Sequence, residues 1–169
     1  QGDADAFPPA RIGIERLLAA HSDRVVAECP QDHEDLVRLY DADPGRISMV
    51  PCGFDPDEFA PMPRDEARAA LGIPEDEFLV LQLGRMVPRK GVDTVVRAMA
   101  RLPGHVSARL RVVGGECDVP DPVRTPEIGR LQRVARECGV ADRVVFEGRK
   151  PRSALRRWYA AADVFVTTP

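Results

Sequence analysis

Phosphate binding is the first chemistry that the residue types suggest. The segment Gly84–Gly91, GRMVPRKG, leads from an apolar stretch into a helical pattern and carries two glycines and three basic residues. Arg85 offers a planar guanidinium that can grip phosphate oxygens, whereas Lys90 offers a compact point charge. Glycine lets the backbone approach a ligand, and free N–H groups at a helix start favour an anion. On these residues alone, an ordinary basic surface loop is an equally good interpretation.

The spacing excludes two common phosphate loops. A Walker A loop needs Gly-Lys-Ser/Thr after a glycine-rich run, and the dinucleotide fingerprint needs GxGxxG; this segment has neither. A second basic segment, Gly148, Arg149 and Lys150, follows a later apolar stretch, and a solvated turn is the favoured interpretation for its two side chains. Lys90 and Lys150 are the only lysines of the chain.

Metal and cofactor chemistry is not expected. The four cysteines show no CxxC spacing and the three histidines no HxxxH spacing, so a zinc site is not predicted. Asp-x-Asp triplets occur at Asp3–Asp5, Asp41–Asp43 and Asp55–Asp57. None follows an apolar strand and two adjoin prolines, so turn formation is the interpretation we favour. A buried, inert thiol is expected at Cys52.

Alternating strands and helices must position these loops. In the second half, apolar runs predict strands over 78–83, 110–113, 144–146 and 164–168, and helical spacing predicts helices over 65–71, 92–102, 126–138 and 154–162. Ser153 is the expected N-cap of the last helix. This alternation predicts an α/β fold with a right-handed parallel sheet covered on both faces, its fourth strand beside the first. Ligands of such sheets bind at the carboxyl ends of the strands, where Gly84–Gly91 lies.

The chain divides into three parts. Residues 1–50 predict a helix–strand–helix–strand unit, with helices over 14–21 and 31–40 and strands over 25–28 and 47–50. Residues 51–63, PCGFDPDEFAPMP, hold four prolines and suit a stiff connector, with Phe54 and Phe59 as expected packing anchors. Residues 64–169 form the regular half and stop on its fourth strand. We therefore expect the sequence to be part of something larger.

Amino-acid composition and net charge argue against several classes of protein. The 169 residues are 44% hydrophobic and 30% charged, enough for a packed core. With 24 basic and 27 acidic residues, the net charge of -3 argues against a dedicated nucleic-acid binder. The apolar runs are too short to span a membrane, and no secretory signal is visible. Scattered cysteines fit a reducing compartment, so a cytoplasmic location is expected.

Five stretches, in this order, resemble glycosyltransferase family 4, the retaining enzymes with two facing α/β domains (the GT-B fold), and especially the bacterial members similar to sucrose-phosphate synthase. Each stretch alone is weak, but the ordered set is specific and spans nearly all the chain. The stretches are ISMVPCGFDPDEFAP (47–61), LGRMVPRKGVDTVVRAM (83–99), LRVVGGE (110–116), DRVVFEGRKPRSAL (142–155) and YAAADVFVTTP (159–169).

The resemblance implies Rossmann-like sheet layers of a GT-B enzyme, incomplete at both ends. Residues 1–50 would end the acceptor-side domain, 51–63 would connect the domains, and 64–169 would begin the nucleotide-sugar donor domain. The residues that match the donor-diphosphate site are Gly84, Arg85, Lys90 and Gly91. Arg85 and Lys90 would be catalytic, stabilising the leaving diphosphate without a metal. Gly148, Arg149 and Lys150 match a loop near the nucleotide base.

The implied reaction moves a sugar, as in a hexosyltransferase, from a nucleoside-diphosphate-sugar to an acceptor hydroxyl with retention. The acceptor, whether a sugar, a sugar phosphate or a lipid-linked group, stays open, as do the base and the donor sugar. Two glutamates of the family pattern would follow Pro169, so this chain holds part of a donor site and is not expected to turn over sugar alone. The alternatives are a nucleotide-sugar epimerase of the same fold and a non-catalytic nucleotide-sugar-binding fragment.

Overall fold

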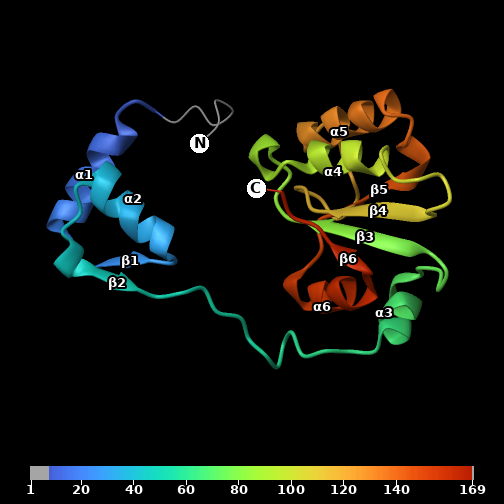
Figure 1. Ribbon diagram of the computed structural model, residues 1–169, viewed down its shortest axis with the longest axis horizontal. Helices are drawn as coiled ribbons and strands as arrows, with labels where there is room; N and C mark the ends of the chain where they lie inside the picture. Colours follow the sequence, from blue (N-terminus) through green and yellow to red (C-terminus); the bar gives the residue numbers. More distant parts are fainter. Residues whose placement is uncertain (1–7, 169) are drawn as a thin grey trace. The chain divides into compact units, whose positions relative to one another are not determined.

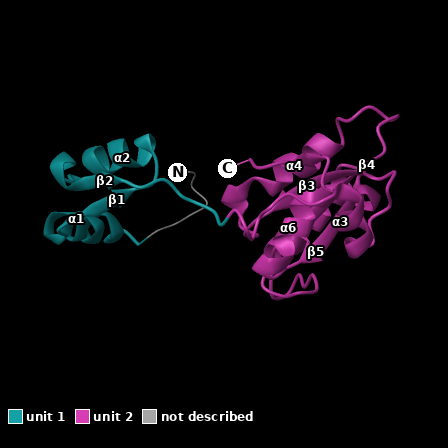
Figure 2. Cartoon of the chain, turned by 90° about the horizontal axis from the view of Figure 1, so that it is seen from below, with its two compact units in different colours: residues 1–55 teal, residues 56–169 magenta. Residues whose placement is uncertain are grey.

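The computed structural model describes residues 8–168, and the chain forms two compact units, residues 1–55 and 56–169 (Figure 2). The boundary between the units falls inside the proline-rich segment 51–63. The triplet Asp3–Asp5 lies outside the described residues. Each unit is treated by itself below.

The first unit pairs two short parallel strands with two helices. Its elements are α1 (Arg11–His21), β1 (Val25–Ala27), α2 (Pro30–Tyr40), a 3-10 turn (Pro44–Arg46) and β2 (Ile47–Met49). Val25 lies opposite Ile47 in the parallel register. Asp41 ends α2 in a left-handed conformation and Asp43 accepts a hydrogen bond from the Gly45 N–H at 2.9 Å. This triplet therefore forms the turn that the sequence predicted.

The second unit is a four-stranded parallel sheet with the order β5-β4-β3-β6 (Figure 1). Its elements are α3 (Arg64–Leu71), β3 (Phe78–Leu83), α4 (Val92–Met99), β4 (Ala108–Val113), α5 (Pro126–Glu137), β5 (Val144–Gly148), α6 (Arg152–Ala161) and β6 (Val164–Phe165). The fourth strand lies beside the first, as predicted. The loops after β3 and β6 therefore leave neighbouring strands at the same edge.

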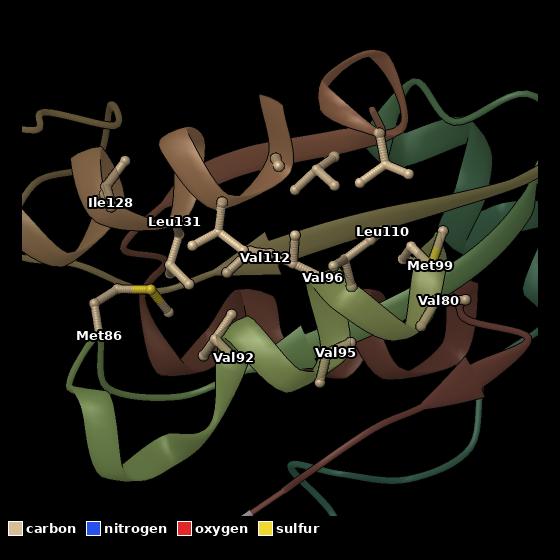
Figure 3. Close-up of a cluster of buried hydrophobic side chains, with 14 of the residues drawn as sticks. Val80, Met86, Val92, Val95, Val96, Met99, Leu110, Val112, Ile128 and Leu131 are labelled. Atoms are coloured by element: carbon tan, nitrogen blue, oxygen red, sulfur yellow. The ribbon is translucent and has the colours of Figure 1, made fainter. Parts of the chain in front are cut away.

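Helices cover both faces of this sheet, with α4 and α5 on one side and α3 and α6 on the other (Figure 1). Alternate residues of β3 point to opposite faces of the sheet and pack into a different hydrophobic cluster on each face. Val80 faces the α4 and α5 side with Val92 and Leu131, all buried (Figure 3). Leu79 and Leu81 are fully buried on the opposite side, in a cluster with Ala67 and Trp158. Full burial of such aliphatic side chains contributes roughly 1.5–3 kcal/mol each, which fixes the strand beneath the loop.

Several local expectations are wrong. Helix α6 begins at Arg152 after Pro151, not at a Ser153 cap, because the fixed φ of proline sets the helix entry. Helix α4 ends at Met99 rather than 102. Phe54 is 71% exposed and anchors nothing, whereas Phe59 packs edge-on against Tyr159, with ring centroids 6.3 Å apart. Cys52 is exposed, not buried.

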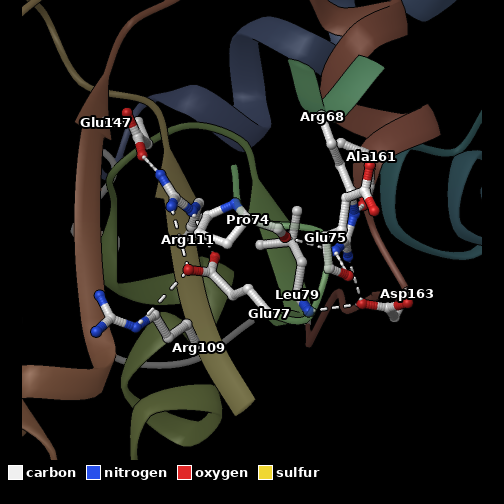
Figure 4. Close-up of polar contacts among 10 residues, drawn as sticks. All are labelled: Arg68, Pro74, Glu75, Glu77, Leu79, Arg109, Arg111, Glu147, Ala161 and Asp163. Carbon is white, nitrogen blue, oxygen red and sulfur yellow. Dashed lines mark hydrogen bonds and ion pairs between the residues drawn. The ribbon is translucent and has the colours of Figure 1, made fainter. Parts of the chain in front are cut away.

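Charged side chains cross-link neighbouring strands of the sheet (Figure 4). Arg111 bonds Glu77 at 3.0 Å and Glu147 at 2.7 Å, and its side chain is only 14% exposed. Both Glu77 and Arg111 look like solvated positions in the sequence, and that expectation is wrong. Burial lowers the pKa of Arg111, but the hydrogen bonds with the two carboxylates outweigh it and leave that pKa raised. The guanidinium therefore stays charged inside the ladder.

Candidate functional site

The loop Gly84–Gly91 leaves β3 at the carboxyl edge and is pressed against the end of β4. The Gly84 N–H donates to the Val113 carbonyl oxygen at 3.1 Å. A Cβ on Gly114 would lie 2.0 Å from the Gly84 carbonyl oxygen, so glycine is required at position 114. Met86, inside the loop, is buried in the core and anchors it there. These contacts fix the start of the loop against β4, and the Arg85 side chain remains exposed.

Arg85 and Lys90 are available to a ligand. Arg85 is exposed and Lys90 is half-buried. Within residues 8–168, neither side chain has a hydrogen-bond or ion-pair partner. By contrast, Arg68, Arg111 and Arg130 are all held by carboxylates. Two unneutralised cations on one anchored loop attract an anion more strongly than paired surface arginines do.

Gly91 joins this loop to α4. Its φ is +59°, a conformation that favours glycine, and its carbonyl oxygen accepts from the Thr94 N–H at 2.9 Å as the helix begins. A Cβ here would lie 2.2 Å from the Thr168 carbonyl oxygen, and the Thr168 hydroxyl donates to the Gly91 carbonyl at 2.8 Å. Sequence reasoning missed Thr168. Its position just after β6, beside β3, is the signal that could have found it.

The second predicted segment lies further along the same edge. Gly148 has φ +72°, and a Cβ on it would lie 2.4 Å from the Asp118 carbonyl oxygen. The Arg149 N–H donates to the Cys117 carbonyl at 2.7 Å, and the Lys150 ammonium lies 3.4 Å from the Asp118 carbonyl. The Arg149 guanidinium lies 3.8 Å from the Asp118 carboxylate. The backbone of this segment is therefore tied to the loop after β4, while the Arg149 side chain stays 64% exposed.

Glycine contacts join the loops into one continuous edge. Gly84 touches Gly114 as described, and the Gly114 N–H donates to the Gly148 carbonyl oxygen at 2.9 Å. The structure thus places the segments at Gly84–Gly91 and Gly148–Lys150 on one rim, with the end of β4 between them. Because backbones approach so closely there, this rim can present main-chain groups and cations to an extended anionic ligand.

Residues 8–168 contain no group of three or more His, Cys, Asp or Glu arranged to hold a metal ion. None of the helices described there is both long and apolar enough to cross a membrane.

Comparison with known sequences points to one family. The family model of glycosyl transferases group 1 matches residues 63–169. A D-inositol 3-phosphate glycosyltransferase of Xylanimonas cellulosilytica is 42% identical over 163 residues, which cover 93% of this chain and 37% of that protein. The protein of the same name from Mycolicibacterium smegmatis is 37% identical, over 96% of this chain and 36% of its own length. This chain therefore spans well under half the length of these relatives.

Solved structures agree on the fold. The sucrose-phosphate synthase of Thermosynechococcus elongatus matches with a TM-score of 0.83 and 33% identity, over 97% of this chain and 39% of that one. The Anabaena protein HepE, solved in complex with UDP and glucose, matches with a TM-score of 0.80 over 96% of this chain and 42% of its own. At 20% identity, the second likeness speaks for the fold alone. The expected GT-B sheet layers, incomplete relative to these structures, are confirmed.

Proposed function

Because the chain belongs to the glycosyl transferases group 1 family, we propose that the whole protein transfers a sugar from a nucleoside-diphosphate-sugar to an acceptor hydroxyl with retention of configuration. This chain covers only 37% of a typical relative, so it would supply part of the donor site. One observation carries the proposal: Arg85 and Lys90, without partners among residues 8–168, lie on an anchored loop at the sheet's carboxyl edge.

The proposed chemistry is electrostatic. When the bond between the anomeric carbon and the donor phosphate breaks, negative charge grows on the leaving diphosphate. Cations already fixed in place stabilise that charge more in the transition state than in the ground state, which lowers the barrier. Arg85 would grip two oxygens through its fork and Lys90 would supply the second charge, so no divalent ion is needed for this step.

The donor class draws support from the neighbours. HepE was solved with UDP and with UDP-glucose, which supports a nucleotide-sugar donor for a chain of the same fold. We place Gly148, Arg149 and Lys150 near the nucleotide base, because they continue the rim beyond the end of β4. The relatives' names make D-inositol 3-phosphate the first acceptor to try.

Steady-state kinetics of the full-length protein test the proposal. UDP-, ADP- and GDP-sugars are offered with D-inositol 3-phosphate and other hydroxyl acceptors, and the anomeric configuration of the product is read by NMR. Arg85→Ala and Lys90→Ala should each lower kcat/KM about 100-fold or more, the size typical of losing one transition-state charge contact. The control is Arg133→Ala, which removes an exposed arginine of α5.

Three outcomes would contradict the proposal in whole or in part. Unchanged kcat/KM in both loop variants would remove Arg85 and Lys90 from the donor site. Consumption of the nucleotide-sugar at the full rate with acceptor omitted, giving an isomerised sugar, would indicate an epimerase instead. An inverted product would retain the transferase assignment and exclude the retaining mechanism.

A further inference from the structure

The segment that follows β6 is bonded to the loop that carries Lys90. The Thr168 hydroxyl donates to the Gly91 carbonyl oxygen at 2.8 Å and lies 3.3 Å from the Lys90 carbonyl oxygen. The Thr168 backbone also fills the space where a Cβ of Gly91 would stand, at 2.2 Å. Two loops that are 77 residues apart in sequence thus meet in direct contact.

This contact completes the restraint on the main chain at Lys90. On the loop side, the Lys90 N–H donates to the Val87 carbonyl at 3.0 Å and the Gly91 N–H donates to the Pro88 carbonyl at 2.9 Å. On the helix side, the Gly91 carbonyl accepts from Thr94. The Thr168 hydroxyl bonds the same carbonyl from the segment that follows β6, so it holds the point where the loop becomes a helix.

The position of a lysine ammonium depends on the direction in which its Cα–Cβ bond leaves the main chain. Four rotatable bonds follow, so a small tilt of the backbone at Lys90 moves the charge and widens the range of positions that it samples. A displacement of about 1 Å in a group that must meet its ligand can cost as much as 100-fold in rate. A bond that fixes the Lys90 and Gly91 peptide therefore bears on how well Lys90 meets a phosphate.

We propose that Thr168 is a positioning residue of the donor site, whose hydroxyl holds the main chain at Lys90 and Gly91 so that the ammonium meets the donor diphosphate. The inference rests on the proposed function, since it takes Lys90 as a diphosphate ligand. It adds to the loop Gly84–Gly91 a residue from the segment that follows β6.

Calorimetric titration of the full-length protein with UDP, ADP and GDP tests this inference. Thr168→Val removes the hydroxyl and keeps the shape, and it should weaken diphosphate affinity roughly five- to tenfold, the worth of one hydrogen bond. Thr168→Ser keeps the hydroxyl and should stay within about twofold of the wild type. Thr167→Val, the same change at the exposed neighbour, is the matched control.

The decisive arm combines Thr168→Val with Lys90→Ala. If Thr168 acts through Lys90, removing the hydroxyl costs no further affinity once the ammonium is gone, because the two effects are not additive. Thermal unfolding shows that each variant is folded. If Thr168→Val does not fold, Thr168→Ala removes the hydroxyl without a branched side chain.

The outcomes separate this inference from the proposed function. If Lys90→Ala weakens binding and Thr168→Val does not, the inference is overturned and the proposed function stands. An equal loss from Thr168→Val in both backgrounds also overturns it, because Thr168 would then act without Lys90. If Lys90→Ala binds like the wild type, the inference is overturned and only Arg85 is left to carry the proposed function. If no diphosphate binds the wild type, both are overturned.

Discussion

Gly91 occupies a left-handed conformation where the loop Gly84–Gly91 turns into α4, and the Thr168 carbonyl stands where a side chain would begin. Gly139, after α5, has a similar φ of +69° but open space around it. A side chain at either position would have to adopt the left-handed backbone conformation. Only at position 91 would its Cβ also clash with Thr168.

Replacing each of these glycines by alanine should have unequal effects on stability. Gly139→Ala pays only for the left-handed backbone, about 1 kcal/mol. Gly91→Ala must also displace Thr168, and we expect a loss of about 3 kcal/mol in the free energy of unfolding, since overpacking adds about 1–3 kcal/mol. Urea unfolding of the two variants measures the difference. Equal losses would contradict the close contact between the loops.

The thiol of Cys52 differs from the sequence expectation in a testable way. It is exposed, and its hydrogen bond and charge interaction with Glu28 raise the pKa of the thiol. A raised pKa leaves less thiolate at neutral pH and moves the alkylation profile to higher pH. Glu28→Gln should therefore speed iodoacetamide labelling of Cys52 at pH 7–8, read by peptide mass spectrometry. The matched control, Glu34→Gln, should not; an unchanged rate in Glu28→Gln would contradict the contact.

At the scale of elements, one carboxylate joins α3 to β3. Asp163 accepts from the Arg68 guanidinium and from the Leu79 N–H, each at 2.7 Å (Figure 4). It also pairs with Arg64 of α3. Arg68 is almost fully buried and also donates to the Ala161 carbonyl at 3.0 Å. The network sets where β6 begins beside β3, and so where Thr168 arrives.

Asp163→Asn should be strongly destabilising because it leaves the buried Arg68 without its counter-charge. We expect a loss of about 3 kcal/mol in the free energy of unfolding, the usual cost of breaking one side of a buried pair. The exposed pair Arg38–Asp35 provides the comparison, and Asp35→Asn should cost less than about 1 kcal/mol. Chemical denaturation compares them; similar small losses would mean that the Asp163 network is not important for stability.

Element boundaries show what the sequence could and could not predict. The strand over 78–83 is confirmed residue for residue, because its unbroken apolar run is typical of a buried parallel strand. The ladder of Glu77, Arg111 and Glu147 was missed, because it depends on which strands are neighbours in the sheet. Charge patterns along one strand do not contain that information.

At the scale of the whole molecule, the order of the motifs predicted the family, and the alternation of strands and helices predicted that the fourth strand of the sheet lies beside the first. The contact between Thr168 and Gly91 could not be predicted in this way, because it arises only when β6 lies beside β3. The placement of Arg85 and Lys90 on the carboxyl edge follows from the sequence; their use by a donor remains a prediction.

The most direct measurement compares the affinities of a nucleoside diphosphate and its nucleoside for the full-length protein, by calorimetry in the presence of EDTA. If Arg85 and Lys90 hold the diphosphate without a metal, UDP, ADP or GDP should bind far more tightly than its nucleoside. In the Arg85→Ala, Lys90→Ala double variant that advantage should collapse, while binding of the nucleoside stays the same. An advantage that survives in the double variant would contradict the account.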